Sequence, residues 1–354
     1  MRTPTVVAAS DAKGCRSSGH PHGPRGHQPG QHRDAQKRRL RRDGRGGPSP
    51  PAEGVEAPSR RPAAAADFSE LPYELMARIG AAMDVPSLRA ASAVCRSWRE
   101  ALAPLRLAMV LLFSGKRFKH GHGGGPRDPQ MALSSFLKGA QLGSAAAMVD
   151  AGLIYWEMGR KEEGRALYRK AAELGHPAAQ CNLGISYLQA DQPDYKEAVK
   201  WLYQSALSGY ARAQYSFALC LHRGHGVKCN PSEAAKWFLR AAEAGNVRAM
   251  YNTSICYSTG EGVRQNHQQA RMWMKQAADL GHRKAQLEHG LELFSSGNLM
   301  RALFYLELAM RAGETSATHV KDVLLQTLSP VLIHRALSLA DEWQKSHFSR
   351  HRSG

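Results

Sequence analysis

A glycine that returns at nearly constant spacing between residues 143 and 313 constrains the fold more than any other feature. Successive gaps between these glycines are 32, 34, 36, 36 and 32 residues, and an alanine follows each glycine by four residues. The pairs are Gly143 and Ala147, Gly175 and Ala179, Gly209 and Ala213, Gly245 and Ala249, Gly281 and Ala285, and Gly313 and Ala317. A fixed period of this length is typical of proteins built from stacked repeats.

The apolar pattern inside each period predicts two helices. Twelve residues after the glycine comes a large apolar residue, which places one apolar face on a first helix: Tyr155, Tyr187, Leu221, Tyr257, Leu293 and Leu325. An aromatic residue marks the second helix eight residues before the closing glycine: Trp201, Trp237, Trp273 and Tyr305. Seven residues before each aromatic residue stands a side chain suited to capping a helix N-terminus: Asp194, Asn230, Asn266 and Asn298. The recurring glycine suits the left-handed position after a helix.

No such unit buries its apolar face alone, so the sequence predicts an all-α solenoid in which neighbouring units share a continuous core. The small alanines allow two helix backbones to approach, and the aromatic side chains fill the space between pairs. A stripe of aromatic residues that stacks on a ligand is the alternative. Core packing is the favoured interpretation, because aromatic residues at helical spacing are usually buried.

Two Gly-x-Gly-Val loops, at residues 224–227 and 260–263, extend this pattern, which resembles Sel-one-like repeats, relatives of the tetratricopeptide repeat. The resemblance covers about residues 145–314 and implies a right-handed α-solenoid that binds proteins. We expect the array over residues 127–314, with a half-repeat at 127–144. Capping helices are expected at 315–348, broken at Ser329-Pro330, before a tail at 349–354. The sequence departs from the repeat pattern around Gly209 and in a short loop at 295–297.

A basic segment precedes the array. Residues 1–66 carry 13 Lys/Arg and 5 Asp/Glu and contribute +8 of the net charge of +18. The segment is rich in Gly, Pro, Ser and His and poor in branched and aromatic residues, so we expect a disordered tail. Its basic cluster at 37–42 is interpreted as a nuclear import signal, a contact for polyanions or a solvated stretch.

The expected location is the cytoplasm, the nucleus or both. No run of eighteen apolar residues occurs in the sequence. The apolar stretch near the N-terminus is too short for a secretory signal. An organellar transit peptide is the disfavoured alternative. The six cysteines form no CxxC pair, which favours reduced thiols. No membrane association is predicted.

A short amphipathic segment lies between the tail and the array. Pro72 suits a helix start, and Leu71, Leu75, Ile79 and Met83 then recur every four residues. Ser87 is expected to cap a second helix that carries Leu88, Ala91, Cys95, Trp98 and Leu102. A motif of about forty residues with so little internal core suggests docking onto another protein. We expect a linker at 106–126.

Leu-Pro-x-Glu-Leu at 71–75, followed by Val-Cys-Arg-Ser-Trp-Arg at 94–99, resembles the F-box, over residues 67–105. The combination with Sel-one-like repeats resembles plant-like F-box proteins. The resemblance implies that the segment binds the Skp adaptor and, through it, the cullin and RING protein of a ubiquitin ligase. The implied adaptor-binding or supporting residues are Leu71, Pro72, Leu75, Ile79, Val94, Cys95 and Trp98. Gly80 replaces the larger apolar residue usual in the family. An ordinary lead-in hairpin of the solenoid is the alternative.

Catalytic chemistry is not predicted, and no cofactor or metal is expected. The one metal-like grouping is Cys220, His222, His225, Cys229 and Cys256, and its spacing differs from the common zinc patterns. The repeat register explains it better. The Gly-x-Gly pairs lack the preceding strand that a phosphate-binding loop requires.

The sequence therefore predicts a non-catalytic substrate receptor of an SCF-type ubiquitin ligase, whose repeats hold an unknown target protein. A repeat scaffold without ubiquitin transfer is the alternative, and no specific nucleic-acid binding is expected because no groove-reading motif is present. Arg212, Arg248 and Lys284 each follow a recurring glycine by three residues. They are the predicted target-binding row for an acidic or phosphorylated segment, with a solvated basic face as the alternative.

Overall fold

The computed structural model describes residues 71–81, 83, 85–121 and 125–352. Within these residues the chain is helical and contains no strand. Residues 72–354 form one compact unit. The predicted disordered tail and its basic cluster lie outside the described residues.

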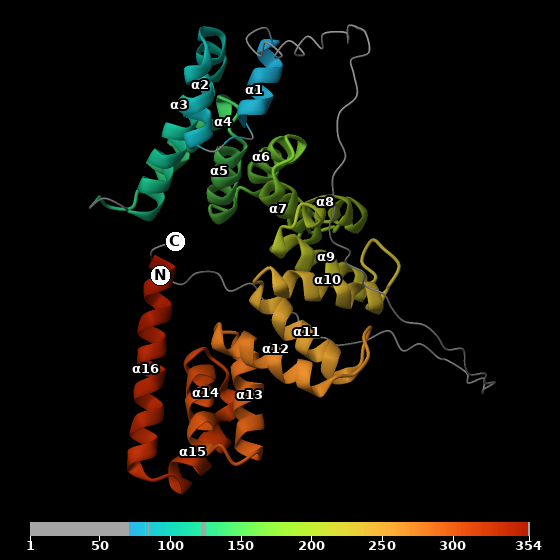
Figure 1. Cartoon of the computed structure of the whole chain (residues 1–354), viewed down its shortest axis with the longest axis vertical. Helices are drawn as coiled ribbons and strands as arrows, with labels where there is room; N and C mark the ends of the chain where they lie inside the picture. The colour runs from blue at the N-terminus through green and yellow to red at the C-terminus, as the bar shows by residue number, and fades with distance from the viewer. Residues whose placement is uncertain (1–70, 82, 84, 122–124, 353–354) are drawn as a thin grey trace, which may run out of the picture. The chain divides into compact units, whose positions relative to one another are not determined.

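The helices follow one another in a simple order (Figure 1). The first three are α1 (Tyr73–Ala81), α2 (Val85–Val94) and α3 (Arg96–His120). The next group is α4 (Pro129–Gln141), α5 (Ala145–Glu157), α6 (Lys161–Glu173), α7 (Pro177–Leu188), α8 (Tyr195–Leu207), α9 (Ala211–Arg223) and α10 (Pro231–Glu243). The last group is α11 (Val247–Thr259), α12 (His267–Asp279), α13 (Arg283–Ser295), α14 (Leu299–Arg311), the 3-10 turn η2 (Thr315–Ala317), α15 (Thr318–Thr327) and α16 (Pro330–Arg352).

The helices pair as the repeat pattern predicts. From α5 to α14, each odd-numbered helix packs against the next to form a unit, and each even-numbered helix then packs against the first helix of the following unit. First helices of neighbouring units are also in contact: α5 contacts α7, and α7 contacts α9. Every unit thus buries its apolar face against its neighbours, which confirms the α-solenoid.

The recurring glycines end the second helices with left-handed backbone. Their φ angles lie between 81° and 94°, a region that a side chain disfavours. The residue after the glycine then donates back into the closing turn, as His176 N–H does to the Ala171 carbonyl at 3.1 Å. Three residues with the glycine in the middle thus separate each unit from the next.

Three of the four predicted N-caps are confirmed. Asp194, Asn230 and Asn266 accept hydrogen bonds from the first-turn amides of α8, α10 and α12. Asn298 occupies the same position before α14, but its side chain makes no cap bond there.

The caps of the first helices were not predicted. Ser144, His176, Asn246 and His282 follow the recurring glycines, and each accepts from the amide three residues later. Histidine is an unusual cap, and Nδ1 is the accepting atom in both cases.

The core confirms the roles assigned to alanine and to most of the aromatic residues. All six alanines that follow the recurring glycines are fully buried. Trp237, Trp273 and Tyr305 are at most 8% exposed, whereas Trp201 is partly exposed. Ridges of small residues let the helices approach closely, and the rings fill the gaps.

The structure corrects two expectations near the start of the unit. The helix expected to begin after Ser87 and to run through Leu102 is broken at Cys95, whose backbone is extended (φ −155°, ψ 174°). Ser87 lies inside α2 rather than at its cap. Residues 106–120 are not a linker, because α3 continues to His120 and packs along α4.

The C-terminal helices close the array. α15 ends at Thr327 and α16 begins at Pro330, so the predicted break at Ser329-Pro330 is confirmed. α16 packs against α14. Ala336 and Ala340 are fully buried, and the indole N–H of Trp343 donates to the Asp279 carbonyl at 3.2 Å. Among the described helices, none has the length and apolarity to cross a bilayer.

Candidate protein-binding sites

The first candidate site is carried by α1, α2 and the start of α3. Both α1 and α2 pack on α3, and a small core of Met76, Leu88, Trp98 and Leu102 joins them, each at most 6% exposed. This core is too small to account for all the apolar residues of the segment. Several of the others are exposed to solvent.

Three predicted adaptor-binding side chains are those exposed residues. Leu75 and Ile79 are each 42% exposed and Val94 is 68% exposed. Leu75 and Ile79 are four residues apart and lie on one face of α1. Exposing large apolar side chains to water is unfavourable. Covering them with a partner protein lowers the free energy and so favours binding.

The other predicted residues of this set are placed differently. Pro72 is exposed just before α1, whereas Leu71 and Cys95 are partly buried. Trp98 lies in the small core, where it supports the helices. The sequence pattern grouped surface residues and supporting residues together, and the structure separates them.

Packing in this small core leaves no room for a side chain at Gly80. A Cβ atom at this position would collide with the end of the Leu102 side chain, and it would lie 3.0 Å from a methyl of Leu105. The glycine is buried and therefore brings α1 close to α3. Its departure from the family pattern alters internal packing and not the exposed face of α1.

The second candidate site is the basic row of Arg212, Arg248 and Lys284. All three are exposed and occupy the second position of α9, α11 and α13, respectively. Arg212 donates to the Asn182 side chain of α7 at 3.1 Å. The row thus runs along the N-terminal turns of three successive first helices, where backbone N–H groups also favour anions.

The pKa of His282 is lowered by burial and by the positive charges of two members of this row. Burial, followed by the charges of Arg248 and Lys284, lowers the pKa of His282 to about 4. Both cations therefore act on the same ring. The Tyr251 ring stacks on His282 at 4.6 Å, and its hydroxyl donates to Glu288 at 2.6 Å.

The cysteine and histidine grouping is dispersed by the repeat register. Cys220 and Cys256 are buried in α9 and α11, and burial raises the pKa of each thiol to about 11. His222 lies 3.1 Å from Glu261, and the Cys229 thiol donates to the His222 carbonyl at 3.3 Å. No group of metal-binding side chains occurs among the described residues.

Comparison with known families assigns the segments of the chain in which the two candidate sites lie. Residues 68–107 match the F-box-like family. Five segments match the Sel1 repeat: 106–144, 160–176, 177–210, 211–246 and 247–282. The first Sel1 segment begins within α3, so one helix belongs to both matches.

A protein of Arabidopsis thaliana, F-box protein At1g70590, is 61% identical over 282 residues, which are 78% of this chain and 80% of that protein. The chain therefore belongs to the F-box proteins that carry Sel1 repeats.

Solved structures of Sel1 repeat proteins share the fold. The protective antigen c5321 of uropathogenic Escherichia coli has an SLR fold and superposes with a TM-score of 0.59 at 21% identity, covering 80% of this chain and 63% of that one. A Sel1 repeat protein from Oxalobacter formigenes gives a TM-score of 0.56 at 26% identity, covering 72% and 76%.

Proposed function

We propose that this F-box protein is the substrate receptor of an SCF-type cullin-RING ubiquitin ligase and is itself not catalytic. The observation that carries the proposal is the exposed apolar set of Leu75, Ile79 and Val94 on helices with a minimal core of their own. Docking onto a Skp adaptor would bury these side chains. The repeats would then hold a target near the ubiquitin-charged enzyme and raise its effective concentration there.

The adaptor contact is tested by replacing Leu75 and Val94 with arginine in the full chain. Co-purification with the Skp adaptor should be lost while the helices stay folded, because both side chains point to solvent. Leu174→Arg is the matched control, since Leu174 is a 62% exposed apolar residue outside the F-box-like segment. Adaptor binding that survives the double change would contradict the proposed interface and favour a scaffold without ubiquitin transfer.

The basic row is the proposed site for the target. Reversing the charge of Arg212, Arg248 and Lys284 should remove a subset of partners that carry acidic or phosphorylated segments. The control reverses Lys228 and Arg264, two exposed cations that directly follow the equivalent Gly-x-Gly-Val loops. An unchanged set of partners in both variants would refute the row as a target site.

We also propose a cytoplasmic or nuclear location. The basic cluster at 37–42 is the feature that supports nuclear import. Deleting residues 1–66 should reduce any nuclear fraction, and an unchanged distribution would leave the cluster without that role.

A further inference from the structure

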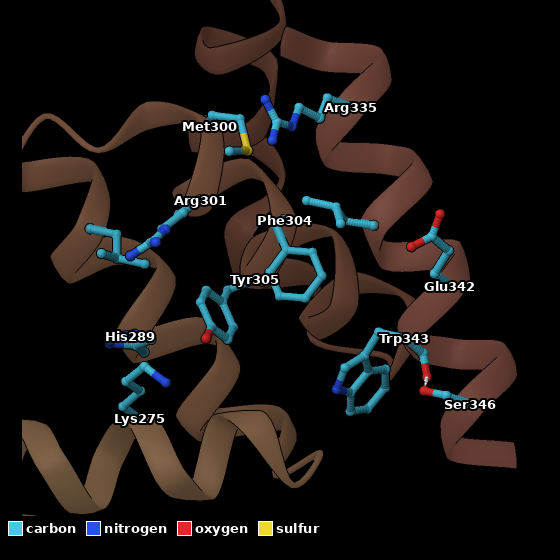
Figure 2. Close-up of a pocket in the computed structure, with 12 residues that line it drawn as sticks. Lys275, His289, Met300, Arg301, Phe304, Tyr305, Arg335, Glu342, Trp343 and Ser346 are labelled. Atoms are coloured by element: carbon cyan, nitrogen blue, oxygen red, sulfur yellow. Dashed lines mark hydrogen bonds between the residues drawn. The ribbon is translucent and has the colours of Figure 1, made fainter.

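A groove of about 920 Å³ lies between α16 and the last repeats (Figure 2). Phe304 and Tyr305 of α14 line it, together with His289 of α13 and Trp343 of α16. Figure 2 shows Phe304 between the two helices and the Trp343 ring pointing from α16 toward α14. The groove shares no residue with the basic row or with the F-box-like helices.

One continuous side of α16 forms a wall of the groove. Arg335, Leu339, Glu342 and Ser346 line it and recur at intervals of four, three and four residues, which is one helix face. Leu339 is 40% exposed although neighbouring Ala336 and Ala340 are fully buried. The alanines bring α16 onto its neighbours along a narrow seam, so Leu339 and Phe304 remain open beside it.

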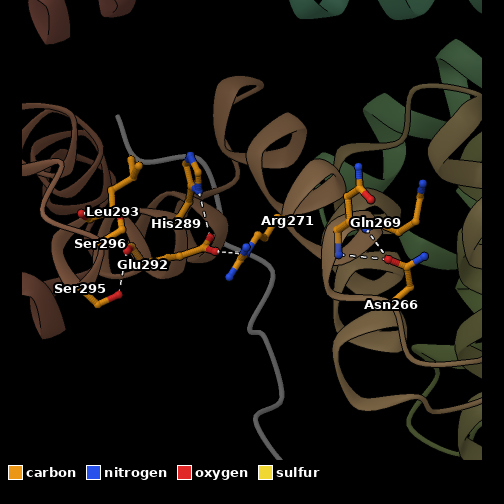
Figure 3. A network of polar contacts seen from close by, with 9 residues as sticks. Asn266, Gln269, Arg271, His289, Glu292, Leu293, Ser295 and Ser296 are labelled. Atoms are coloured by element: carbon orange, nitrogen blue, oxygen red, sulfur yellow. Dashed lines mark hydrogen bonds and ion pairs between the residues drawn. The ribbon is translucent and has the colours of Figure 1, made fainter.

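The opposite side of the groove is held in place by polar contacts between α12 and α13. Glu292 accepts from Arg271 at 2.6 Å and lies 3.5 Å from Nδ1 of His289 (Figure 3). The His289 ring in turn meets Tyr305 edge-on at 4.8 Å. The Tyr305 hydroxyl donates to Asp279 at 2.6 Å. These contacts hold the side of the groove opposite α16 in one arrangement before any partner binds.

Charge around the groove is unbalanced. Three cations line it, Lys275, Arg301 and Arg335, against the single carboxylate of Glu342. Lys275 is paired with Asp279 at 2.6 Å, but no described carboxylate pairs with Arg301 or Arg335. Figure 2 places both arginines toward the end of the groove that holds Met300, away from Trp343 and Ser346. This end attracts anions.

The length of the lined face fits a peptide. Arg335 to Ser346 is a stretch of twelve helical residues that rises by about 16 Å, which is the length of about five residues of extended chain. We propose that the groove binds an extended segment of a partner protein in which a bulky apolar side chain is flanked on one side by acidic residues. The apolar side chain covers Phe304 and Leu339, and the acidic residues pair with Arg301 and Arg335.

Charge argues against the occupants that the chain itself could supply. The tail at 1–66 carries a net charge of +8, and a second copy of the chain brings the same overall excess of +18. Both would place more positive charge beside Arg301 and Arg335. An acidic partner is the occupant that the groove complements.

The test is a selection of displayed random twelve-residue peptides on the full chain, counter-selected on the variant R301E/R335E. Enriched peptides should contain Leu, Met or an aromatic residue with Asp or Glu on one side of it. Affinity of a selected synthetic peptide should fall at least about tenfold in R301E/R335E and in L339E, and should weaken with salt. The control K228E/R264E should bind as the native chain does.

Both groove variants replace exposed side chains, so circular dichroism and thermal melting should match the native chain. The proposal is overturned by three results: a selection without enrichment, basic consensus peptides, or equal binding by the groove variants and the control. If R301E/R335E changes the melting temperature, L339E decides the test. Loss of peptide binding by L339E at unchanged stability supports the groove, and full retention of peptide binding by L339E overturns it.

Discussion

Replacing Trp237 with alanine measures how much of the array's stability depends on the ring between neighbouring units. Trp237 is 5% exposed and meets Phe217 almost at right angles, with ring centroids 5.4 Å apart. The Tyr203 ring lies 6.3 Å away, and the Arg240 guanidinium sits 4.6 Å over the indole. Burying about 200 Å² at about 25 cal/mol per Å² gives roughly 5 kcal/mol. With partial relaxation of the cavity, the expected loss is about 3–5 kcal/mol.

Trp201 supplies the matched control, because it occupies the same register in the preceding unit but is partly exposed. Trp201→Ala should cost about half as much or less, since fewer of its contacts exclude water. Urea unfolding gives the free energy, and amide hydrogen exchange locates the loss in α9 to α11. A cost below about 1 kcal/mol at Trp237, or a larger cost at Trp201, would refute the core role.

Three further predictions use matched positions in the repeats. Because burial and neighbouring cations lower the pKa of His282 to about 4, below its unfolded value, stability should fall as pH drops from about 6.5 toward 4. His282→Asn keeps a cap acceptor and should remove part of that slope in melts across this range. Gly226→Ala should cost clearly more than Gly209→Ala in denaturant, because both have φ above 70° but only the former would push a Cβ into a backbone carbonyl of α8. Asn230→Ala should cost about 1 kcal/mol and Asn298→Ala close to nothing, since only Asn230 makes a cap bond.

The repeat architecture was predictable because its determinants are local. A left-handed glycine, an alanine four residues later and an aromatic residue one helix on each act within a single unit. The glycine and alanine recur six times and the aromatic residue four times. The histidine caps were missed because residue preference at a helix start favours Ser, Thr, Asp and Asn. His176 and His282 stand at the same register as Ser144 and Asn246, so alignment of the units by their glycines contained the signal.

The candidate sites were predictable only in part. Spacing placed Leu75 and Ile79 on one face of a short helix, and the F-box resemblance added Val94. Their exposure depends on which faces α3 covers, and that is a tertiary property. The groove beside α16 could not be read from the sequence at all. It depends on how far α16 stands from α14, which the buried Ala336 and Ala340 determine together with the anchor at Trp343.

The expected linker at 106–126 is the most informative error. Gly121 and the glycines after it drew attention to a break, and the helix does end there, at His120, with Gly121 in left-handed backbone. Upstream of that point, however, Ala108 and Gly115 are buried, and a Cβ at Gly115 would collide with Phe136 of α4. Close packing of α3 on α4 extends the helix to His120, through most of the segment that was predicted to be a linker.

The continuity of α3 determines how the F-box-like helices are connected to the repeats. α3 contributes Trp98 and Leu102 to the core under the exposed adaptor face, and its second half pairs with α4 as the first Sel1 unit. Its 25 residues span about 37 Å without an interruption other than Pro104. A helix turns by about 100° with each residue, so the sequence length between Leu102 and Ala108 fixes both the distance and the rotation of the repeats relative to the F-box-like helices. In the proposed receptor, a target held on the repeats would therefore be presented to the ligase in one orientation rather than on a flexible tether, which is the condition under which a high effective concentration is reached.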